Sequence, residues 1–330
     1  MLNYKKYTEQ IFDIKTENEF IELCLTAFKY QYKNNEIYKQ YCNFLKIKPE
    51  KVNNTSEIPF LPISFFKTHK IITKSKNFDI IFTSSSTTGS TPSSHYISDI
   101  EIYKKSFIKN FEYFYSSPNE YVILALLPSY LERSGSSLIY MLRDLINLSN
   151  NKESGFFLNQ YQDLQDTILS LEKKSQKYIL LGVSFALLDF AEEYKLNLNH
   201  GIVMETGGMK GRRKEITRYE LHKILKTAFS CENIHSEYGM TELLSQAYSK
   251  KDGIFECPPQ MRVLIRDPYD ALSVKPNGKG ALNIIDLANI NSCCFIETSD
   301  LGSVFTNGNF EVSGRFDVSE IRGCNLMISE

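Results

Sequence analysis

The chain has almost no net charge, no long apolar run and no signal for export. Its 38 lysines and arginines nearly balance 39 aspartates and glutamates, so there is no basic excess of the kind that nucleic-acid binding requires. One of the longest apolar runs, Val122 to Leu127, has about a third of the length of a membrane-spanning helix. We therefore expect neither nucleic acid as a partner nor a membrane span.

The cysteine spacing argues against a cysteine metal site, and the first residues argue against a secreted protein. The seven cysteines have no metal-ligand spacing, and the neighbours Cys293 and Cys294 cannot form an ordinary disulfide with each other. The start of the chain lacks the apolar segment of a secretion signal. We expect a cytoplasmic protein whose thiols are mostly free, with Cys24 in the core.

The first part of the chain, residues 1–76, is expected to be a helical portion packed on the core. Thr16 and Glu19 form a capping box for one helix, and apolar residues at 37, 41 and 44 indicate a second. Two prolines in residues 58–67 exclude a helix there, while the aromatic residues between them require burial. This segment should be extended and held against the core.

Residues 77–255 alternate short apolar runs with helical periods, which predicts an α/β core with a largely parallel sheet. The runs fall at 78–82, 121–127, 177–183 and 201–205, and the amphipathic segments near 98–115, 136–148, 161–174 and 184–195. Ser98 and Glu101 should form a capping box at the first of these helices. Polar or glycine-rich turns follow the runs, where the carboxyl ends of parallel strands bind ligands.

Residues 256–317 have a different sequence pattern, which predicts short strands separated by turns. The expected strands are 261–266, 280–286, 293–298, 302–305 and 310–313. This is an antiparallel β subdomain, and residues 318–330 are expected to be a hinge-like tail.

The hydroxyl-rich loop from Thr83 to Pro92 is the first candidate site. It follows an apolar run, and its hydroxyls and backbone N–H groups are suited to an anion. The expected phosphate ligands are Ser84, Ser85, Ser86, Thr87, Thr88 and Gly89. It is not a Walker loop, because no Gly-Lys-Ser/Thr follows, and a low-complexity surface loop is the alternative.

Three further motifs carry groups that fit a nucleotide. In residues 235–242, Tyr238 offers a flat ring and Gly239 allows close approach, while Thr241 can donate to phosphate and Glu242 can bind Mg²⁺. Asp300, which we place at the end of a strand, can accept the hydroxyls of a ribose. Arg315 can hold the same sugar or a phosphate.

Together, these four motifs resemble in order and approximate spacing those of the adenylate-forming ligase superfamily. The resemblance is closer to its acyl-protein synthetase branch, the LuxE type, on four points: residues 58–67, Gly207 to Gly211, the short overall length, and Arg322 to Leu326.

The resemblance implies roles for individual residues. The loop at Ser84 to Gly89 would wrap the phosphates of ATP, and Thr241 would contact phosphate while Glu242 holds Mg²⁺. Gly207, Gly208 and Tyr238 would flank the adenine, Gly239 would also belong to the nucleotide site, and Asp300 and Arg315 would bind the ribose. The acyl substrate would bind near Tyr130, Gly208 and Lys210.

The resemblance also implies a reaction in which a fatty or related carboxylic acid becomes an acyl-adenylate and is then transferred to the protein's own Cys324. An acyl reductase or acyltransferase partner would take it from there. Two alternatives stay open: coenzyme A or a carrier protein as the acceptor, and a non-catalytic nucleotide- or acyl-binding scaffold.

The sequence departs from the superfamily in two places. Ser93 follows Pro92 where the superfamily usually has a lysine, so we expect Lys210, Arg212 or Arg213, or backbone N–H groups, to replace that charge. The chain also stops at residue 330, just past the hinge-like motif, so we expect the C-terminal lid domain to be absent.

Overall fold

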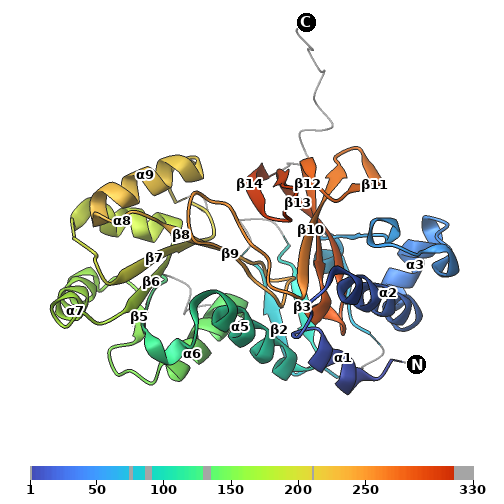
Figure 1. Ribbon diagram of the computed structural model, residues 1–330, viewed down its shortest axis with the longest axis horizontal. Coiled ribbons are helices and arrows are strands. Elements are labelled where there is room, and N and C mark those ends of the chain that lie inside the picture. The colour runs from blue at the N-terminus through green and yellow to red at the C-terminus, as the bar shows by residue number, and fades with distance from the viewer. Residues whose placement is uncertain (1, 74–76, 86–90, 129–134, 210–211, 316–330) are drawn as a thin grey trace, which may run out of the picture.

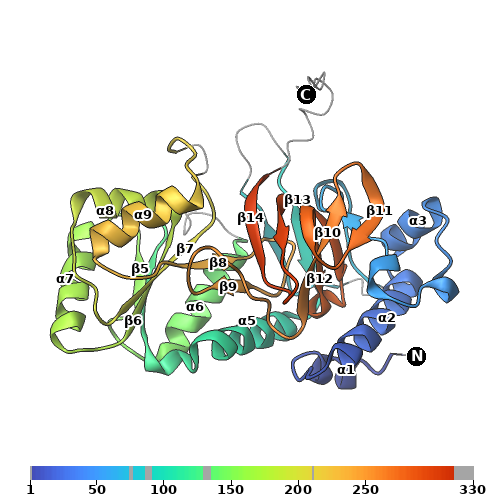
Figure 2. The ribbon, with the colours of Figure 1, turned by 45° about the horizontal axis from the view of Figure 1, so that its top comes forward.

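Two six-stranded sheets lie side by side and carry the fold (Figures 1 and 2). The computed structural model describes residues 2–73, 77–85, 91–128, 135–209 and 212–315. The expected α/β class, with a parallel sheet and an antiparallel one, is confirmed.

The first sheet has the strand order β5-β4-β6-β7-β8-β9 and is parallel except at β9. Its strands are β4 (Val122–Leu126), β5 (Gly155–Phe157), β6 (Tyr178–Val183), β7 (Gly201–Thr206), β8 (His235–Tyr238) and β9 (Ala247–Ser249). Every residue of β4 and β6 is buried, as both faces of a central parallel strand require. The strands expected at 121–127, 177–183 and 201–205 are therefore confirmed.

Helices cover both faces of this sheet, with α8 and α9 on one side and α5 and α6 on the other (Figures 1 and 2). The bounds are α5 (Ile100–Tyr115), α6 (Ser137–Ser149), α7 (Tyr161–Lys173), α8 (Ser184–Glu193) and α9 (Arg218–Phe229). The capping box expected at Ser98 is wrong. Asp99 is the N-cap and accepts a hydrogen bond from Glu101 N at 3.1 Å, so Glu101 falls one position too early to complete a box.

The apolar run at 78–82 does not enter the parallel sheet, which corrects our expectation. Its strand, β2 (Ile80–Thr83), pairs with β3 (Ser94–Ile97) in a separate antiparallel ribbon. Only ten residues separate the two strands, which is too short for the crossover that parallel pairing needs. The hydroxyl-rich loop therefore joins the strands of a hairpin.

The second sheet has the order β1-β13-β12-β10-β11, and β14 pairs with β13 on the same edge as β1. Its strands are β1 (Leu61–Pro62), β10 (Met261–Asp267), β11 (Asp270–Lys275), β12 (Gly278–Asp286), β13 (Phe295–Val304) and β14 (Phe310–Arg315). The two strands expected at 293–298 and 302–305 are one strand, β13. Asp300 lies in its interior rather than at a strand end, because pairing with β12 and β14 continues through the turn-like residues.

The N-terminal helices pack against this second sheet (Figure 1). They are α1 (Tyr4–Gln10), α2 (Glu17–Asn34) and α3 (Glu36–Phe44). The Thr16–Glu19 capping box is confirmed, and Cys24 is fully buried. Phe44 is not part of a buried helix face, since it is 83% exposed at the last position of α3.

The proline-containing segment is extended where its prolines lie and helical after them. β1 pairs in parallel with β13, and Ile63 N donates to Glu297 O at 2.9 Å. The chain then forms one helical turn, α4 (Phe65–Thr68), so the expected extended segment ends before residue 67. Four short 3₁₀ turns complete the described elements: η1 (Pro49–Lys51), η2 (Thr55–Glu57), η3 (Pro118–Glu120) and η4 (Leu287–Asn289).

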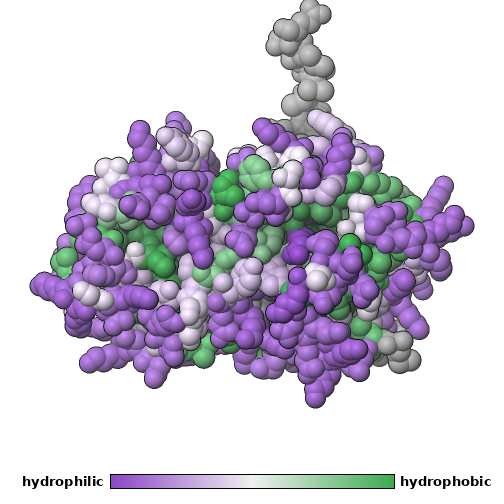
Figure 3. All heavy atoms as spheres, viewed as in Figure 1, coloured by the Kyte–Doolittle hydropathy of each residue, from purple (hydrophilic) through white to green (hydrophobic). Residues whose placement is uncertain are grey.

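The face seen in Figure 3 is mainly hydrophilic, with scattered apolar residues. Across the described ranges, no helix combines the length and the apolarity needed to cross a membrane.

Candidate functional site

Tyr238, Asp300 and Arg315 meet where the two sheets adjoin. The Tyr238 hydroxyl, at the end of β8, donates to Asp300 Oδ2 at 2.6 Å. Arg315 Nε lies 3.1 Å from Asp300 Oδ1, because the two residues are register partners on β14 and β13. The Arg315 side chain is 78% exposed while that of Asp300 is 6% exposed. The guanidinium faces solvent and can meet a ligand, while the buried carboxylate keeps spare lone pairs.

An aromatic cluster fixes the Tyr238 ring. Its centroid lies 5.4 Å from that of Phe310 in an edge-to-face contact and 5.7 Å from that of Phe255. Burial, followed by the negative charge of Asp300, raises the pKa of the Tyr238 hydroxyl well above its usual value. The hydroxyl therefore stays protonated and acts as a hydrogen-bond donor.

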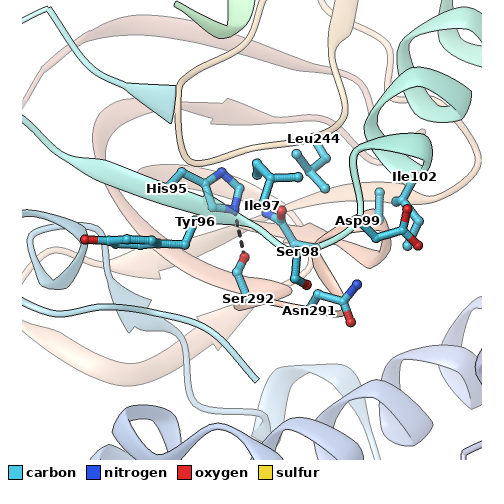
Figure 4. Close-up of a pocket in the computed structure, with 11 residues that line it drawn as sticks. His95, Tyr96, Ile97, Ser98, Asp99, Ile102, Leu244, Asn291 and Ser292 are labelled. Carbon is cyan, nitrogen blue, oxygen red and sulfur yellow. Dashed lines mark hydrogen bonds between the residues drawn. The ribbon is translucent and has the colours of Figure 1, made fainter. Parts of the chain in front are cut away.

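The loop after β8 is held by buried polar groups from the second sheet and from β3. His95 Nδ1 lies 2.8 Å from the carbonyl oxygen of Thr241, and its Nε2 lies 2.9 Å from Ser292 Oγ (Figure 4). Asn289 Nδ2 donates to the carbonyl oxygen of Glu242 at 2.8 Å. Burial lowers the pKa of His95 to about 4, so the ring is neutral near neutral pH. These contacts fix the backbone at Thr241 and Glu242, and nothing in residues 235–242 signals them.

A second anchor of this loop is Asp286, at the end of β12. Its Oδ2 accepts hydrogen bonds from Leu244 N at 2.7 Å and Ser245 N at 2.9 Å. The small cavity drawn in Figure 4 borders this region and encloses about 10 Å³, which is room for one water molecule at most. It is part of the packing rather than a substrate pocket.

Glu242 is the candidate carboxylate for binding a metal ion. The residue is 5% exposed, and burial raises its pKa, while Ser93, Arg315 and Lys67 lower it. No set of three His, Cys, Asp or Glu side chains in the described ranges is arranged to hold a metal ion. One carboxylate fits Mg²⁺ nevertheless, because Mg²⁺ in nucleotide sites is bound by one or two carboxylates together with the phosphates.

The hydroxyl-rich loop is described only at its ends. Ser93 N donates to Ser84 Oγ at 2.8 Å, and Ser84 N donates to Ser93 O at 3.1 Å, so these residues continue the β2–β3 pairing. Ser85 is exposed. Four of the expected phosphate ligands lie outside the described residues: Ser86, Thr87, Thr88 and Gly89.

Gly207 and Gly208 lie directly after β7. Gly207 has φ +68°, a conformation that favours glycine, and its carbonyl oxygen accepts from Ser184 Oγ at 3.0 Å. No atom lies within 4 Å of the position of a Cβ on Gly208, so space is open there. At Gly239, by contrast, a Cβ would lie 2.4 Å from Glu237 Oε1. Three other expected site residues, Tyr130, Lys210 and Cys324, lie outside the described residues.

A buried cluster around Glu205 supports β7 and was not expected from the sequence. Arg218 Nε lies 2.9 Å from Glu205 Oε1, and His222 Nε2 lies 3.4 Å from the same oxygen. Burial alone would raise the pKa of Glu205, but His222 and Arg218 more than offset it and the pKa is lowered. Arg218 also donates to the carbonyl oxygen of Val312 at 3.2 Å, which links the first sheet to β14.

Arg212 and Arg213, two of the residues proposed to replace the missing lysine, make contacts with α8. Arg213 Nε donates to Asp189 at 2.7 Å, and its Nη1 donates to Glu192 at 2.7 Å. The Arg212 guanidinium lies 5.0 Å from the ring centroid of Phe185.

Comparison with known proteins finds similarity to one family of ligases. The profile of the family described as "Acyl-protein synthetase, LuxE" matches residues 11–123. The "Long-chain-fatty-acid--luciferin-component ligase" of Vibrio harveyi is 24% identical over 335 residues, covering 92% of this chain and 85% of its own. The chain therefore resembles LuxE-type acyl-protein synthetases over residues 11–123 and the V. harveyi ligase over most of its length. Its curated relatives in this family are named as ligases.

Solved structures show that the fold is the one found in adenylate-forming ligases. A 2-hydroxyisobutyryl-CoA ligase in complex with 2-HIB-AMP has a TM-score of 0.67 at 12% identity, over 91% of this chain and 67% of that one. ATP-bound MatB from Rhodopseudomonas palustris has a TM-score of 0.54 at 15% identity, over 80% of this chain. The chain spans about half the length of MatB, 49% of it.

Proposed function

We propose that the protein activates a fatty or related carboxylic acid with ATP and transfers the acyl group to its own Cys324. The main support is the arrangement of Tyr238, Asp300 and Arg315 beside the loop carrying Thr241 and Glu242. In this proposal Asp300 binds the sugar, Arg315 supplies a cation and Glu242 is the metal-binding carboxylate. The V. harveyi relative, whose name specifies a long-chain fatty acid, supports the choice of acid.

The first step forms an acyl-adenylate. A carboxylate oxygen of the acid attacks the α-phosphorus of ATP, and the bond from that phosphorus to the bridging oxygen of pyrophosphate breaks. Asp300 and Arg315 hold the ribose, and Thr241 donates to phosphate. Glu242 would hold Mg²⁺, which neutralises phosphate charge when bound.

The second step transfers the acyl group to sulfur. The Cys324 thiolate attacks the carbonyl carbon of the adenylate, the thiol proton goes to solvent, and AMP leaves with the electrons of the broken C–O bond. The resulting thioester would be delivered to an acyl reductase or acyltransferase. The cytoplasmic location expected from the sequence stays a prediction.

Labelling with a radioactive fatty acid tests both steps. With ATP and Mg²⁺, the wild-type protein should acquire a label that hydroxylamine removes, as a thioester requires. Cys324→Ser should lose this label and keep ATP–pyrophosphate exchange, because adenylation precedes transfer. Cys231→Ser is the matched control, since Cys231 is half-buried, and it should keep the label.

Other outcomes separate the alternatives. A label that survives Cys324→Ser contradicts the assigned acceptor. Acyl transfer to added coenzyme A or carrier-protein pantetheine, without labelling of the protein, would support the corresponding ligase instead. Absence of exchange with every carboxylic acid tested would contradict adenylation and leave a binding subunit.

A further inference from the structure

The departing pyrophosphate needs positive charge, and three of the cations in the described ranges have other partners, Arg315 being assigned to the ribose as well. Arg315 is paired with Asp300, and Arg218 with the buried carboxylate of Glu205. Lys70 Nζ lies 4.8 Å from the ring centroid of Phe78 and 5.0 Å from that of Tyr96. An anion at Glu242 and Thr241 would therefore need a further cation.

Lys67, in the one-turn helix α4, is placed to supply it. The side chain is exposed, and it forms no ion pair with any carboxylate in the described ranges. The residue before it, Phe66, packs against His95, which contacts the loop that carries Thr241 and Glu242. A lysine whose helix reaches the Thr241–Glu242 loop through His95, and which has no carboxylate partner in the described ranges, is available to bind phosphate.

Buried contacts fix α4 in this position. Phe66, next to Lys67, is 1% exposed, and its ring meets that of His95 edge to face with centroids 5.5 Å apart. The same histidine reaches the carbonyl oxygen of Thr241, next to Glu242. His95 therefore connects Phe66, which precedes Lys67, to Thr241, which precedes Glu242.

The strand before α4 gives a second, independent constraint. β1 occupies the edge of β13 that also carries β14 with Arg315, and Ile63 N donates to Glu297 O on that edge. β3, against which α4 packs, begins at Ser94, directly after the hydroxyl-rich loop. The helix therefore packs against the strand that follows that loop, and the strand before the helix lies on the β13 edge.

We propose that Lys67 binds the β- and γ-phosphates of ATP and stabilises the departing pyrophosphate, in the role for which the loop after Pro92 has no lysine. This assignment rests on the proposed adenylation reaction. An ammonium ion aimed at charge that develops in the transition state should contribute mainly to kcat. Because Lys67 is exposed, its loss should not disturb folding.

The test compares Lys67→Met with Lys67→Arg and with Lys29→Met, an exposed lysine of α2, as the control. In ATP–pyrophosphate exchange, Lys67→Met should lower kcat by about 10²-fold with a smaller change in KM for ATP. Lys67→Arg should recover most of the loss, and Lys29→Met should match wild type. Unchanged kcat in Lys67→Met would overturn the proposal.

Binding of inorganic pyrophosphate, measured by calorimetry on the full chain, keeps this test separate from the proposed function. Lys67→Met should weaken binding by about tenfold, and the difference from wild type should shrink as salt concentration rises. This readout decides the role of Lys67 even if no acid supports exchange. Equal pyrophosphate affinity for Lys67→Met and wild type would contradict the assignment.

Discussion

Glu237 is a buried carboxyl group immediately before the Tyr238 ring. It is 7% exposed and accepts a hydrogen bond from the Thr206 hydroxyl. Burial and, to a lesser degree, the negative charge of Glu205 raise its pKa to about 7, while Thr206 lowers it. At the residue scale, the strand that presents Tyr238 therefore carries a group that titrates near neutral pH.

This pKa predicts a pH-dependent stability. The folded protein keeps the Glu237 proton between about pH 4.5 and 7, where the unfolded chain has lost it, so stability falls as pH rises through this range. The contribution is about 3 kcal/mol. Urea unfolding of wild type and Glu237→Gln at several pH values should show their stability difference changing by this amount. A difference independent of pH would contradict the raised pKa.

At the scale of secondary-structure elements, the contacts of interest are those that join the two sheets. Arg218, the first residue of α9, bridges β7 and β14. It bonds to Glu205 on β7 and to the carbonyl oxygen of Val312 on β14. Its guanidinium lies 5.0 Å from the ring centroid of Phe255. The Glu205 side chain is 2% exposed, so it depends on these partners for its charge.

Removing this arginine should weaken the junction. Arg218→Ala leaves a buried carboxylate with His222 as its remaining close basic partner and should lower the free energy of unfolding by about 3 kcal/mol. Arg143→Ala, at an exposed position on α6, should change it by less than about 0.5 kcal/mol. Denaturant unfolding measures both. A loss in Arg218→Ala as small as that of the control would show that the pair contributes little.

At the scale of the whole molecule, a nucleotide would contact both sheets at once. Tyr238 ends a strand of the first sheet, and Asp300 and Arg315 belong to the second. A ligand that binds this junction in the folded chain, and not in the unfolded chain, stabilises the molecule by mass action.

ATP with Mg²⁺ should therefore raise the melting temperature. At a ligand concentration of about 100 times Kd the gain is about 2.7 kcal/mol, or about 4 °C for a chain of this size. Excess chelator should remove most of the shift, because phosphate charge would then be left uncompensated, and Asp300→Asn should reduce it. Differential scanning fluorimetry measures these shifts. An unchanged melting temperature at every ATP concentration would contradict nucleotide binding at this site.

The sequence by itself determined the elements whose signals are local. The buried runs of β4, β6 and β7, the helices between them and the Thr16 cap follow from periodicity and short-range hydrogen bonds. The order of the motifs indicated a resemblance to LuxE-type ligases and named Tyr238, Asp300 and Arg315 as candidates. These properties depend on residues that are close in the chain, so the chain alone contains them.

Only the tertiary structure decided how those elements combine. β2 pairs with β3 instead of joining the parallel sheet, and β13 is one strand because its pairing with β14 continues through residues 300–304. The sequence did not predict either result, because pairing depends on which strands meet in the folded chain. The support of Thr241 by His95 spans 146 positions, and Phe66, which precedes Lys67, packs against that same histidine. No local pattern encodes such contacts, because burial and charge act through space rather than along the sequence.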